Sequence, residues 1–218
     1  MKNIILLAPP AAGKGTQSSM IIEKYGLTHI STGDLLREKI KENSSLANEI
    51  KEYMKKGNLV PNKIILELIS DRMEMSDCAN GCILDGFPRN YDQAVSLDEL
   101  LLKHNMKINA VINLDVKEDI LRKRIVGRLL CPNCNAIYND QIENMNSKEK
   151  GVCDICHSVL IKRDDDNIDT FNNRYNTYIK ETIPLIDYYE RKNILYTVNS
   201  ENSANNVFKS IENIIDNI

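Results

Sequence analysis

Residues 2–16 read KNIILLAPPAAGKGT, an apolar run followed by a glycine-containing loop and the start of a helical pattern. An apolar run without alternation is typical of a strand that is buried on both faces of a parallel sheet. Backbone N–H groups at a helix N-terminus attract phosphate oxygens, and Gly13 and Gly15 let the backbone come close to them. This order predicts a phosphate-binding loop, in which Lys14 neutralises the β- and γ-phosphates and the Thr16 hydroxyl holds Mg²⁺.

Two alanines depart from the usual form of such a loop. The common pattern begins with glycine, whereas this chain has Ala8, so an ordinary strand–helix turn is the alternative interpretation. Ala11 raises a second question, because its β-carbon would strain the loop if the backbone there needed a positive φ. The contacts with phosphate are therefore expected from Gly13, Lys14, Gly15 and Thr16.

The rest of the chain alternates between β-prone and helical segments. This alternation predicts an α/β protein with a three-layer P-loop fold, in which a five-stranded parallel sheet has helices on both faces. In such sheets ligands bind beyond the carboxyl ends of the strands. We expect strands at 2–7, 28–30, 82–84, 110–114 and 195–198, and helices at 15–25, 32–42, 46–56, 61–75, 92–104, 117–129 and 204–215, with a further helix that Asp169 caps and Pro184 kinks or breaks.

Composition limits the possible partners. The 218 residues carry a formal net charge of −3, which disfavours nucleic acid or an anionic membrane as a partner. No apolar run approaches the roughly 20 residues of a membrane span, and a buried strand explains the apolar N-terminus better than a signal peptide does. We therefore expect a cytoplasmic protein whose cysteines are not paired in disulfides.

Two Cys-x-x-Cys pairs lie 18 residues apart and consist of Cys131, Cys134, Cys153 and Cys156. This spacing is typical of a structural zinc site, in which four thiolates surround Zn²⁺ and leave no open position for water. The segment 131–160 has no helical periodicity and little apolar content, so the metal would supply its folding free energy. Metal-free cysteines or redox pairs are the alternatives, and His157 is a weak alternative ligand. Cys78 and Cys82 lack a matching pair and are expected to be packing residues.

Further motifs accompany the phosphate loop. They are Ser31–Arg37 (STGDLLR), Gly57–Pro61 (GNLVP), Asp85–Arg89 (DGFPR) with Gln93, Arg124–Arg128 (RIVGR), and Arg163–Asp166 (RDDD) with Arg174. Together with Gly13–Gln17 (GKGTQ) they resemble the motifs of adenylate kinases, in the same order and over nearly the whole chain. The resemblance is to the long form of the family, whose extended lid carries zinc in many members.

The resemblance implies a division of the chain into three parts. A P-loop core would comprise 1–30, 61–127 and 164–218, an insert at 31–60 would bind the nucleoside monophosphate, and a lid at 128–163 would hold the zinc. The two inserts flank the cleft and would close over it, which keeps water away from the phosphoryl group. The family is mostly monomeric, so a monomer is expected.

The resemblance also implies a role for particular residues. Those that clamp the transferring phosphates, and count as catalytic, would be Lys14, Arg89, Arg128, Arg163 and Arg174. ATP would contact Ala12, Gly13, Lys14, Gly15, Thr16, Arg124, Arg128, Tyr138 and Ser200, with Arg124 against the adenine. AMP would contact Thr32, Arg37, Leu59, Val60, Gly86, Arg89, Gln93, Arg163 and Arg174. Mg²⁺ would be held by Thr16 and, through water, by Asp85.

The implied activity is reversible transfer of a phosphoryl group from ATP-Mg²⁺ to AMP, which gives two ADP. Such transfer needs alignment and charge compensation, and arginine suits it because its planar fork meets phosphate oxygens in pairs. The second pKa of a phosphate monoester is about 6, so the acceptor is already ionised at neutral pH. No general base is required, and neither Asp85 nor Asp34 is expected to act as one.

Several alternatives remain at this point. Arg124 and Arg128 lie four residues apart on the expected helix and could form a solvated face. The acidic run Asp164–Asp166 could be a solvated run or a helix-start cluster, although in the family it partly holds the lid against the core. The acceptor could be a pyrimidine nucleotide or the donor GTP, and the unusual alanines allow a nucleotide-binding protein without catalysis. His29 and His104 are expected to be structural or at the surface.

Overall fold

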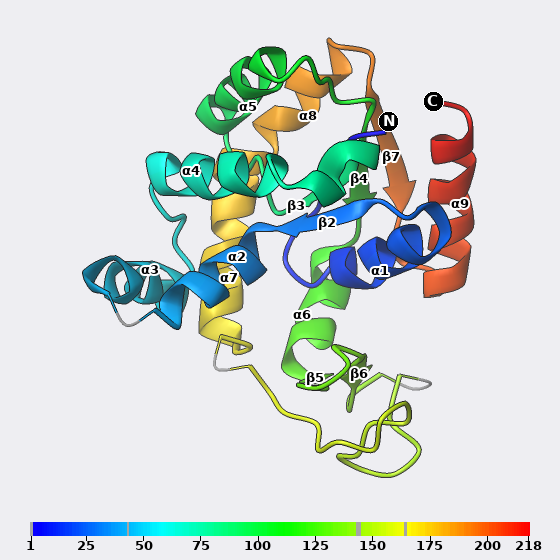
Figure 1. Cartoon of the computed structure of the whole chain (residues 1–218). Coiled ribbons are helices and arrows are strands. Elements are labelled where there is room, and N and C mark those ends of the chain that lie inside the picture. Colours follow the sequence, from blue (N-terminus) through cyan, green and yellow to red (C-terminus); the bar gives the residue numbers. More distant parts are fainter. Residues whose placement is uncertain (1, 43, 143–144, 164) are drawn as a thin grey trace.

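A five-stranded sheet forms the centre of the computed structural model, which describes residues 2–42, 44–142, 145–163 and 165–218. The strands are parallel throughout and follow the order β2-β3-β1-β4-β7 (Figure 1), which confirms the predicted sheet. They are β1 (Ile4–Leu7), β2 (Thr28–Ser31), β3 (Cys82–Asp85), β4 (Ala110–Asp115) and β7 (Leu195–Asn199).

Helices cover both faces of this sheet (Figure 1). Successive side chains of a strand point to opposite faces, so the apolar run of β1 serves two buried clusters, one containing Ile5 and Leu7 and the other Ile4 and Leu6. The first cluster includes side chains of α4 (Asn62–Met73), α5 (Tyr91–Lys103) and α8 (Pro184–Glu190). The second includes side chains of α1 (Lys14–Tyr25), α6 (Glu118–Val126) and α9 (Ala204–Asp216). The three-layer prediction is therefore confirmed.

Two excursions leave this core. The first carries α2 (Thr32–Ile40) and α3 (Ser45–Lys56), which begin at the serine caps Ser31 and Ser44. The second carries the antiparallel pair β5 (Arg128–Leu130) and β6 (Ile137–Asn139), which lies apart from the central sheet in Figure 1. The chain returns through α7 (Ile168–Thr177) and the π-helical turn η2 (Tyr178–Thr182), and a short 3₁₀ helix, η1 (Ser76–Asn80), precedes β3.

The structure corrects two details of the predicted helices. The helix expected at 117–129 ends at Val126, and after Gly127 the chain pairs with β6, with Arg128 opposite Asn139. Arg128 therefore lies on β5 and does not share a helix face with Arg124. The cap of α7 is Asn167, whose side chain accepts from the N–H of Thr170, and not Asp169.

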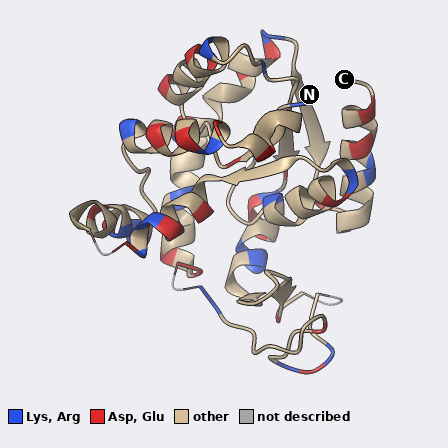
Figure 2. Cartoon of the chain, viewed as in Figure 1, with Lys and Arg blue, Asp and Glu red and all other residues tan. Residues whose placement is uncertain are grey.

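The break expected at Pro184 is confirmed, since this residue begins α8 directly after the π-helical turn. Acidic and basic residues are interspersed along the outer helices (Figure 2). Among the described residues, no helix combines the length and the apolar character that crossing a membrane requires.

Candidate active site

The loop between β1 and α1 has the geometry of a phosphate cradle. Gly13 caps α1 with a φ of 96°, a conformation open to glycine at little cost. The ammonium group of Lys14 turns back over the loop, where its Nζ donates to the carbonyl oxygens of Ala8 at 3.1 Å and Pro9 at 3.4 Å. The N–H groups of the first turn of α1 thus face an opening beside a cation.

Ala11 has a φ of 64°, in the left-handed region. Whether Ala11 needs a positive φ was open from the sequence alone, and the structure shows that it does. For an L-residue this conformation costs roughly 1–2 kcal/mol. Ala8, by contrast, is not among the described residues with a positive φ. The unusual loop therefore holds strain at one alanine and not at both.

Replacing Ala11 with glycine is expected to stabilise the protein by about 1 kcal/mol. The change removes the left-handed strain, and the greater freedom of glycine in the unfolded chain offsets only part of that gain. Urea unfolding of the free protein measures the difference. Ala12→Gly is the matched control, because Ala12 is buried and is not among the described residues with a positive φ, and this variant is expected to lose stability. Equal destabilisation by both changes would contradict strain at Ala11.

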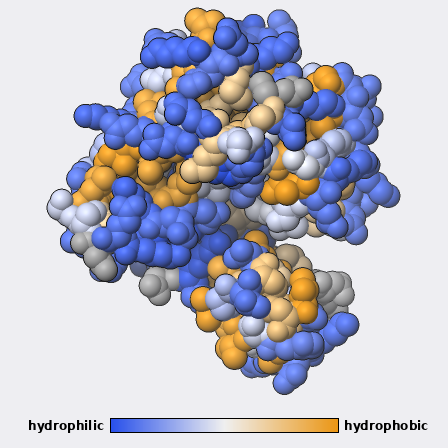
Figure 3. Space-filling model, viewed as in Figure 1, coloured by the Kyte–Doolittle hydropathy of each residue, from blue (hydrophilic) through white to orange (hydrophobic). Residues whose placement is uncertain are grey.

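A cleft of about 810 Å³ opens beyond the carboxyl ends of β1, β2 and β3. Figure 3 shows the hollow between the main body and the small lobe that contains β5 and β6. The structure brings all of the predicted nucleotide-binding residues to the walls of this cleft, namely Ala12, Gly13, Lys14, Gly15, Thr16, Thr32, Arg37, Leu59, Val60, Asp85, Gly86, Arg89, Gln93, Arg124, Arg128, Tyr138, Arg163, Arg174 and Ser200.

Two arginines of the cleft are oriented by carboxylates. Arg128 donates to Asp166 from Nε, at 2.7 Å, and from Nη2, and the Asp166 side chain is only 1% exposed. Arg174 donates to Asp165 at 2.5 Å. Although burial opposes it, the charge of Arg174 holds the pKa of Asp165 below its usual value. The acidic run therefore orients arginines instead of forming a solvated run, and its first member, Asp164, lies outside the described residues.

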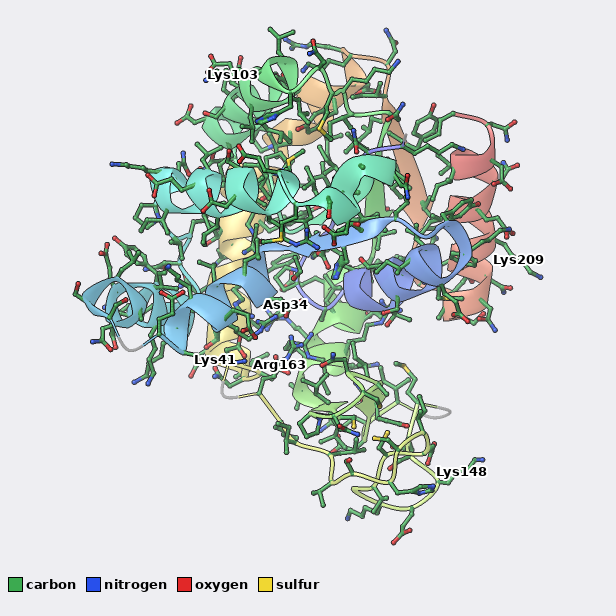
Figure 4. The ribbon with its side chains drawn as sticks, in the orientation of Figure 1. Asp34, Lys41, Lys103, Lys148, Arg163 and Lys209 are labelled. Carbon is green, nitrogen blue, oxygen red and sulfur yellow. The ribbon has the colours of Figure 1, made fainter. Side chains whose placement is uncertain are left out.

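Arg89, Arg124 and Arg163 line the cleft without a carboxylate pair among the described residues. Burial, reinforced by the charges of neighbouring arginines, lowers the pKa of Arg89 and of Arg163. Arg124 is not a solvated residue, since its Nη2 donates to the carbonyl oxygen of Ser200 at 2.9 Å. Figure 4 labels Asp34 on α2 and Arg163 on the chain that returns from the small lobe, and both residues line the cleft. Positive charge is thus concentrated on the walls of the cleft although the whole chain is slightly acidic.

Lys14 and Asp85 form the electrostatic centre of the cleft. Burial and the nearby arginines lower the pKa of Lys14 to about 8, with Asp85 opposing them. Burial alone would raise the pKa of Asp85, but a hydrogen bond from His29 and the charge of Lys14 hold it below its usual value. The Nε2 of His29 lies 3.4 Å from Oδ2 of Asp85. Asp85 is therefore a carboxylate at neutral pH.

His29 is a cleft residue that the sequence did not identify. It lines the cavity and contacts Asp85, although it was expected to be structural or at the surface. Its position could have indicated this, because His29 lies near the carboxyl end of the strand predicted at 28–30, and parallel sheets bind ligands at that end. The contact itself joins β2 to β3, and sequence spacing does not show such pairing.

The wall opposite the phosphate loop is built around Gly86. The Oγ1 of Thr32 donates to the carbonyl oxygen of Gly86 at 2.9 Å. Gly86 has a φ of 78°, and a β-carbon there would lie 2.8 Å from Thr32 Oγ1 and 2.9 Å from Nη2 of Arg89. Asp34 pairs with Arg37 at 2.5 Å. This wall holds Arg37 and Arg89 close to a small, glycine-lined surface.

The four cysteines of the two Cys-x-x-Cys pairs meet in the small lobe. Their sulfur atoms all lie within 4.8 Å of one another, and His157 does not belong to the group. The N–H of Cys134 points to the Sγ of Cys131 at 3.5 Å. Hydrogen bonds, chiefly from Ser158, lower the pKa of Cys156 to about 5, which favours the thiolate. Four converging thiols are a donor set that fits tetrahedral Zn²⁺.

Tyr138 connects this cluster to the cleft. It lines the cavity, while its hydroxyl lies 3.4 Å from the Sγ of Cys153 and accepts from the N–H of Asp154 at 2.8 Å. The cysteine cluster thus holds a side chain of the cleft wall in place.

Comparison with known proteins gives a consistent result. Residues 6–194 match the family model described as "Adenylate kinase". A protein named "Adenylate kinase" from Archaeoglobus fulgidus is 46% identical over 216 residues, which cover 99% of each chain. Proteins of the same name from Clostridium tetani and Clostridioides difficile are each 44% identical, and the alignments cover 98% and 95% of both chains respectively.

Proposed function

Because this chain belongs to the adenylate kinase family, and thus catalyses phosphoryl transfer between ATP and AMP, we propose that its cleft performs the reaction by alignment and charge clamping without a general base. The observation that carries the proposal is the concentration of cationic side chains around one cavity. Besides Lys14 and Arg37, these are Arg89, Arg124, Arg128, Arg163 and Arg174. Cations held on rigid walls stabilise charge as it spreads over the transferred group.

The phosphate loop would hold the donor. Gly13, Gly15 and Thr16 offer backbone N–H groups at the start of α1, and Lys14 would leave the loop carbonyls for the β- and γ-phosphates. Since the pKa of Lys14 is about 8 in the free cleft, an anionic ligand would raise it and keep the side chain charged. Ala12 and Tyr138 also line the cleft and would contact the donor. Arg124 would lie against the donor base near Ser200.

The opposite wall would hold the acceptor. Arg37 and Arg89, which line the cleft, would bind its phosphate. Its sugar and base would be enclosed by Thr32, Leu59, Val60, Gly86 and Gln93. Arg128, Arg163 and Arg174 would lie between the two nucleotides. The acceptor phosphate is ionised at neutral pH, so no side chain has to remove a proton from it.

Two metals complete the proposal. Thr16 and the ionised Asp85 would hold Mg²⁺, in part through water, and this ion would compensate charge on the donor phosphates when bound. Cys131, Cys134, Cys153 and Cys156 would hold a structural Zn²⁺.

The excursions from the core would act as moving parts. We assign the core to 1–30, 61–127 and 164–218, the acceptor-binding insert to 31–60 and the lid to 128–163. Closure of both over the cleft would exclude water, which otherwise competes as an acceptor. We further propose that the protein works in the cytoplasm as a monomer.

An acceptor panel tests the proposed function. ATP-Mg²⁺ is offered with AMP, CMP, UMP or GMP, and the formation of nucleoside diphosphate is followed in a coupled assay. The expected result is turnover with AMP well above the other acceptors, and replacement of ATP by GTP tests the donor. Tight ATP binding without AMP-dependent turnover would instead support a nucleotide-binding protein that lacks catalysis.

A further inference from the structure

The side-chain amide of Gln93 is held at both of its polar atoms. Gln93 is only 2% exposed, and its Oε1 accepts from the main-chain N–H of Arg89 at 2.7 Å. Its Nε2 donates to the Oδ1 of Asn62 at 2.8 Å. An amide has two acceptor sites on oxygen and two N–H groups, so Gln93 retains one of each. A ligand at this wall of the cleft can therefore be offered an acceptor and a donor side by side.

Two anchors, the main chain of Arg89 and the side chain of Asn62, favour the same orientation of this amide. A main-chain N–H can only donate, so the Gln93 atom that faces Arg89 has to be the oxygen. The NH₂ group then points away from Arg89 and needs an acceptor, which Asn62 supplies. The carbonyl oxygen of Arg89 in turn accepts from the Thr182 hydroxyl at 2.8 Å, which ties this stretch of main chain to η2.

A second main-chain anchor orients Asn62. The main-chain N–H of Gln93 donates to the Oδ1 of Asn90 at 2.9 Å, which is the cap of α5. This bond fixes the Asn90 amide, and its Nδ2 faces the Oδ1 of Asn62 at 3.5 Å. Two N–H donors thus converge on the oxygen of Asn62. If the Gln93 amide turned over, its NH₂ group would face the main-chain N–H of Arg89, and its oxygen would face the Oδ1 of Asn62. Both hydrogen bonds would be lost.

We propose that Asn62 is a positioning residue for the acceptor nucleotide, which keeps the Gln93 amide in the orientation that suits adenine. The proposal rests on the proposed function, in which Gln93 contacts the base of AMP. Adenine presents an amino donor next to a ring-nitrogen acceptor, whereas hypoxanthine presents a carbonyl acceptor next to a ring N–H donor. An amide held only by the Arg89 main chain gives up one hydrogen bond when it turns over, so it can adapt to either order. An amide that Asn62 holds as well gives up two and is confined to the first order.

The orientation of the Gln93 amide distinguishes some bases and not others. Cytosine presents an amino donor next to a ring-nitrogen acceptor, as adenine does, so a fixed Gln93 does not distinguish the two by hydrogen bonding. Selection against CMP has to come from the size of the base. Inosine monophosphate (IMP) has the shape of AMP with the reversed edge, so the ratio of AMP to IMP measures the orientation of Gln93, and the ratio of AMP to CMP is an internal control.

Two near-isosteric variants test the role of Asn62. Asn62→Leu removes the acceptor for Gln93, and Asn62→Asp keeps an acceptor that cannot turn over to present a donor. The measurements are kcat/KM for AMP, IMP and CMP with ATP-Mg²⁺, the KM for ATP, and the melting temperature. If Asn62→Leu fails to fold, Asn62→Ala removes the same acceptor without adding apolar bulk.

In Asn62→Leu we expect the preference for AMP over IMP to fall by about tenfold, through a higher KM for AMP and a gain with IMP. The preference for AMP over CMP and the KM for ATP should stay within about twofold of the parent. Asn62→Asp should keep or increase the preference for AMP over IMP.

Two outcomes would overturn the proposal. One is an unchanged preference for AMP over IMP in a folded Asn62→Leu protein. The other is an equal fall in both preferences, which would indicate a loosened pocket and not a released amide. If the parent protein did not use AMP, the proposed function would fail as well, whereas AMP turnover by the parent with unaltered preferences in the variants refutes only the role of Asn62.

Discussion

Replacing Arg89 with methionine is expected to lower kcat/KM for AMP by about 10³-fold, because arginines that compensate the charge of a transferring phosphoryl group contribute on the order of 10³–10⁵ in rate. The same change should leave the melting temperature unchanged or raise it. Burial and the charge of Arg174 lower the pKa of Arg89, with Asp85 opposing them, and the residue is nevertheless exposed, so its replacement removes a cation but little packing. Activity and stability therefore move independently or in opposite directions.

Arg191→Met is the matched control for this prediction. Arg191 follows α8 and is not among the residues that line the active-site cleft, so its loss changes the net charge equally without removing a cation from the cleft. We expect near-normal kinetics for this variant. Initial rates with AMP varied at saturating ATP-Mg²⁺, together with thermal melts, give both quantities. Loss of less than tenfold in Arg89→Met would argue against the clamp at this position.

Replacing Cys153 with serine is expected to release the zinc and unfold the lid. Among the described residues, the buried apolar cluster of the small lobe contains only Cys131, Tyr138, Cys153 and Leu160, and two of these belong to the proposed metal site. So little apolar area cannot offset the entropy of ordering the segment, whereas zinc supplies about 10–16 kcal/mol in comparable peptides. Metal analysis, melting curves and limited proteolysis of the lid should all change together, and stability should fall more than the intrinsic chemistry does.

Cys78→Ala provides the control for this variant. Cys78 is a buried cysteine outside the four-thiol group, so its replacement removes a thiol and keeps the metal site. This protein should purify with the same zinc content as the parent, and a chelator should shift the melting curves of both. A parent protein that purifies without metal and melts identically after chelation would refute a structural role for zinc.

The parts of the molecule that the sequence predicted correctly depend on residues that are close together in the chain. The apolar run of β1 predicted a central strand because both faces of a parallel strand need apolar side chains. The spacing of the cysteines predicted their meeting because each short turn presents two thiols. The boundary of α6 was misplaced because the residues after it belong to a strand whose partner, β6, lies further along the chain, with Arg128 opposite Asn139.

Side-chain pairing across elements was the least predictable part of the cleft. His29 contacts Asp85 only because β2 and β3 are adjacent in the sheet, and their sequence separation gives no sign of this. The pairing of Arg128 with Asp166 likewise joins the lid to the return of the chain. The family resemblance identified the residues of the cleft, but not the partners that orient them.

By itself the sequence determined that a phosphate loop and a four-cysteine unit would form, because in each the chemistry lies within a few consecutive residues. It also determined that the cleft would be rich in arginine. Only the tertiary structure decided that the strain of the loop falls on Ala11 and that Gln93 is held between Arg89 and Asn62. The direction of a hydrogen bond depends on the atom that faces it, and folding alone brings those atoms together.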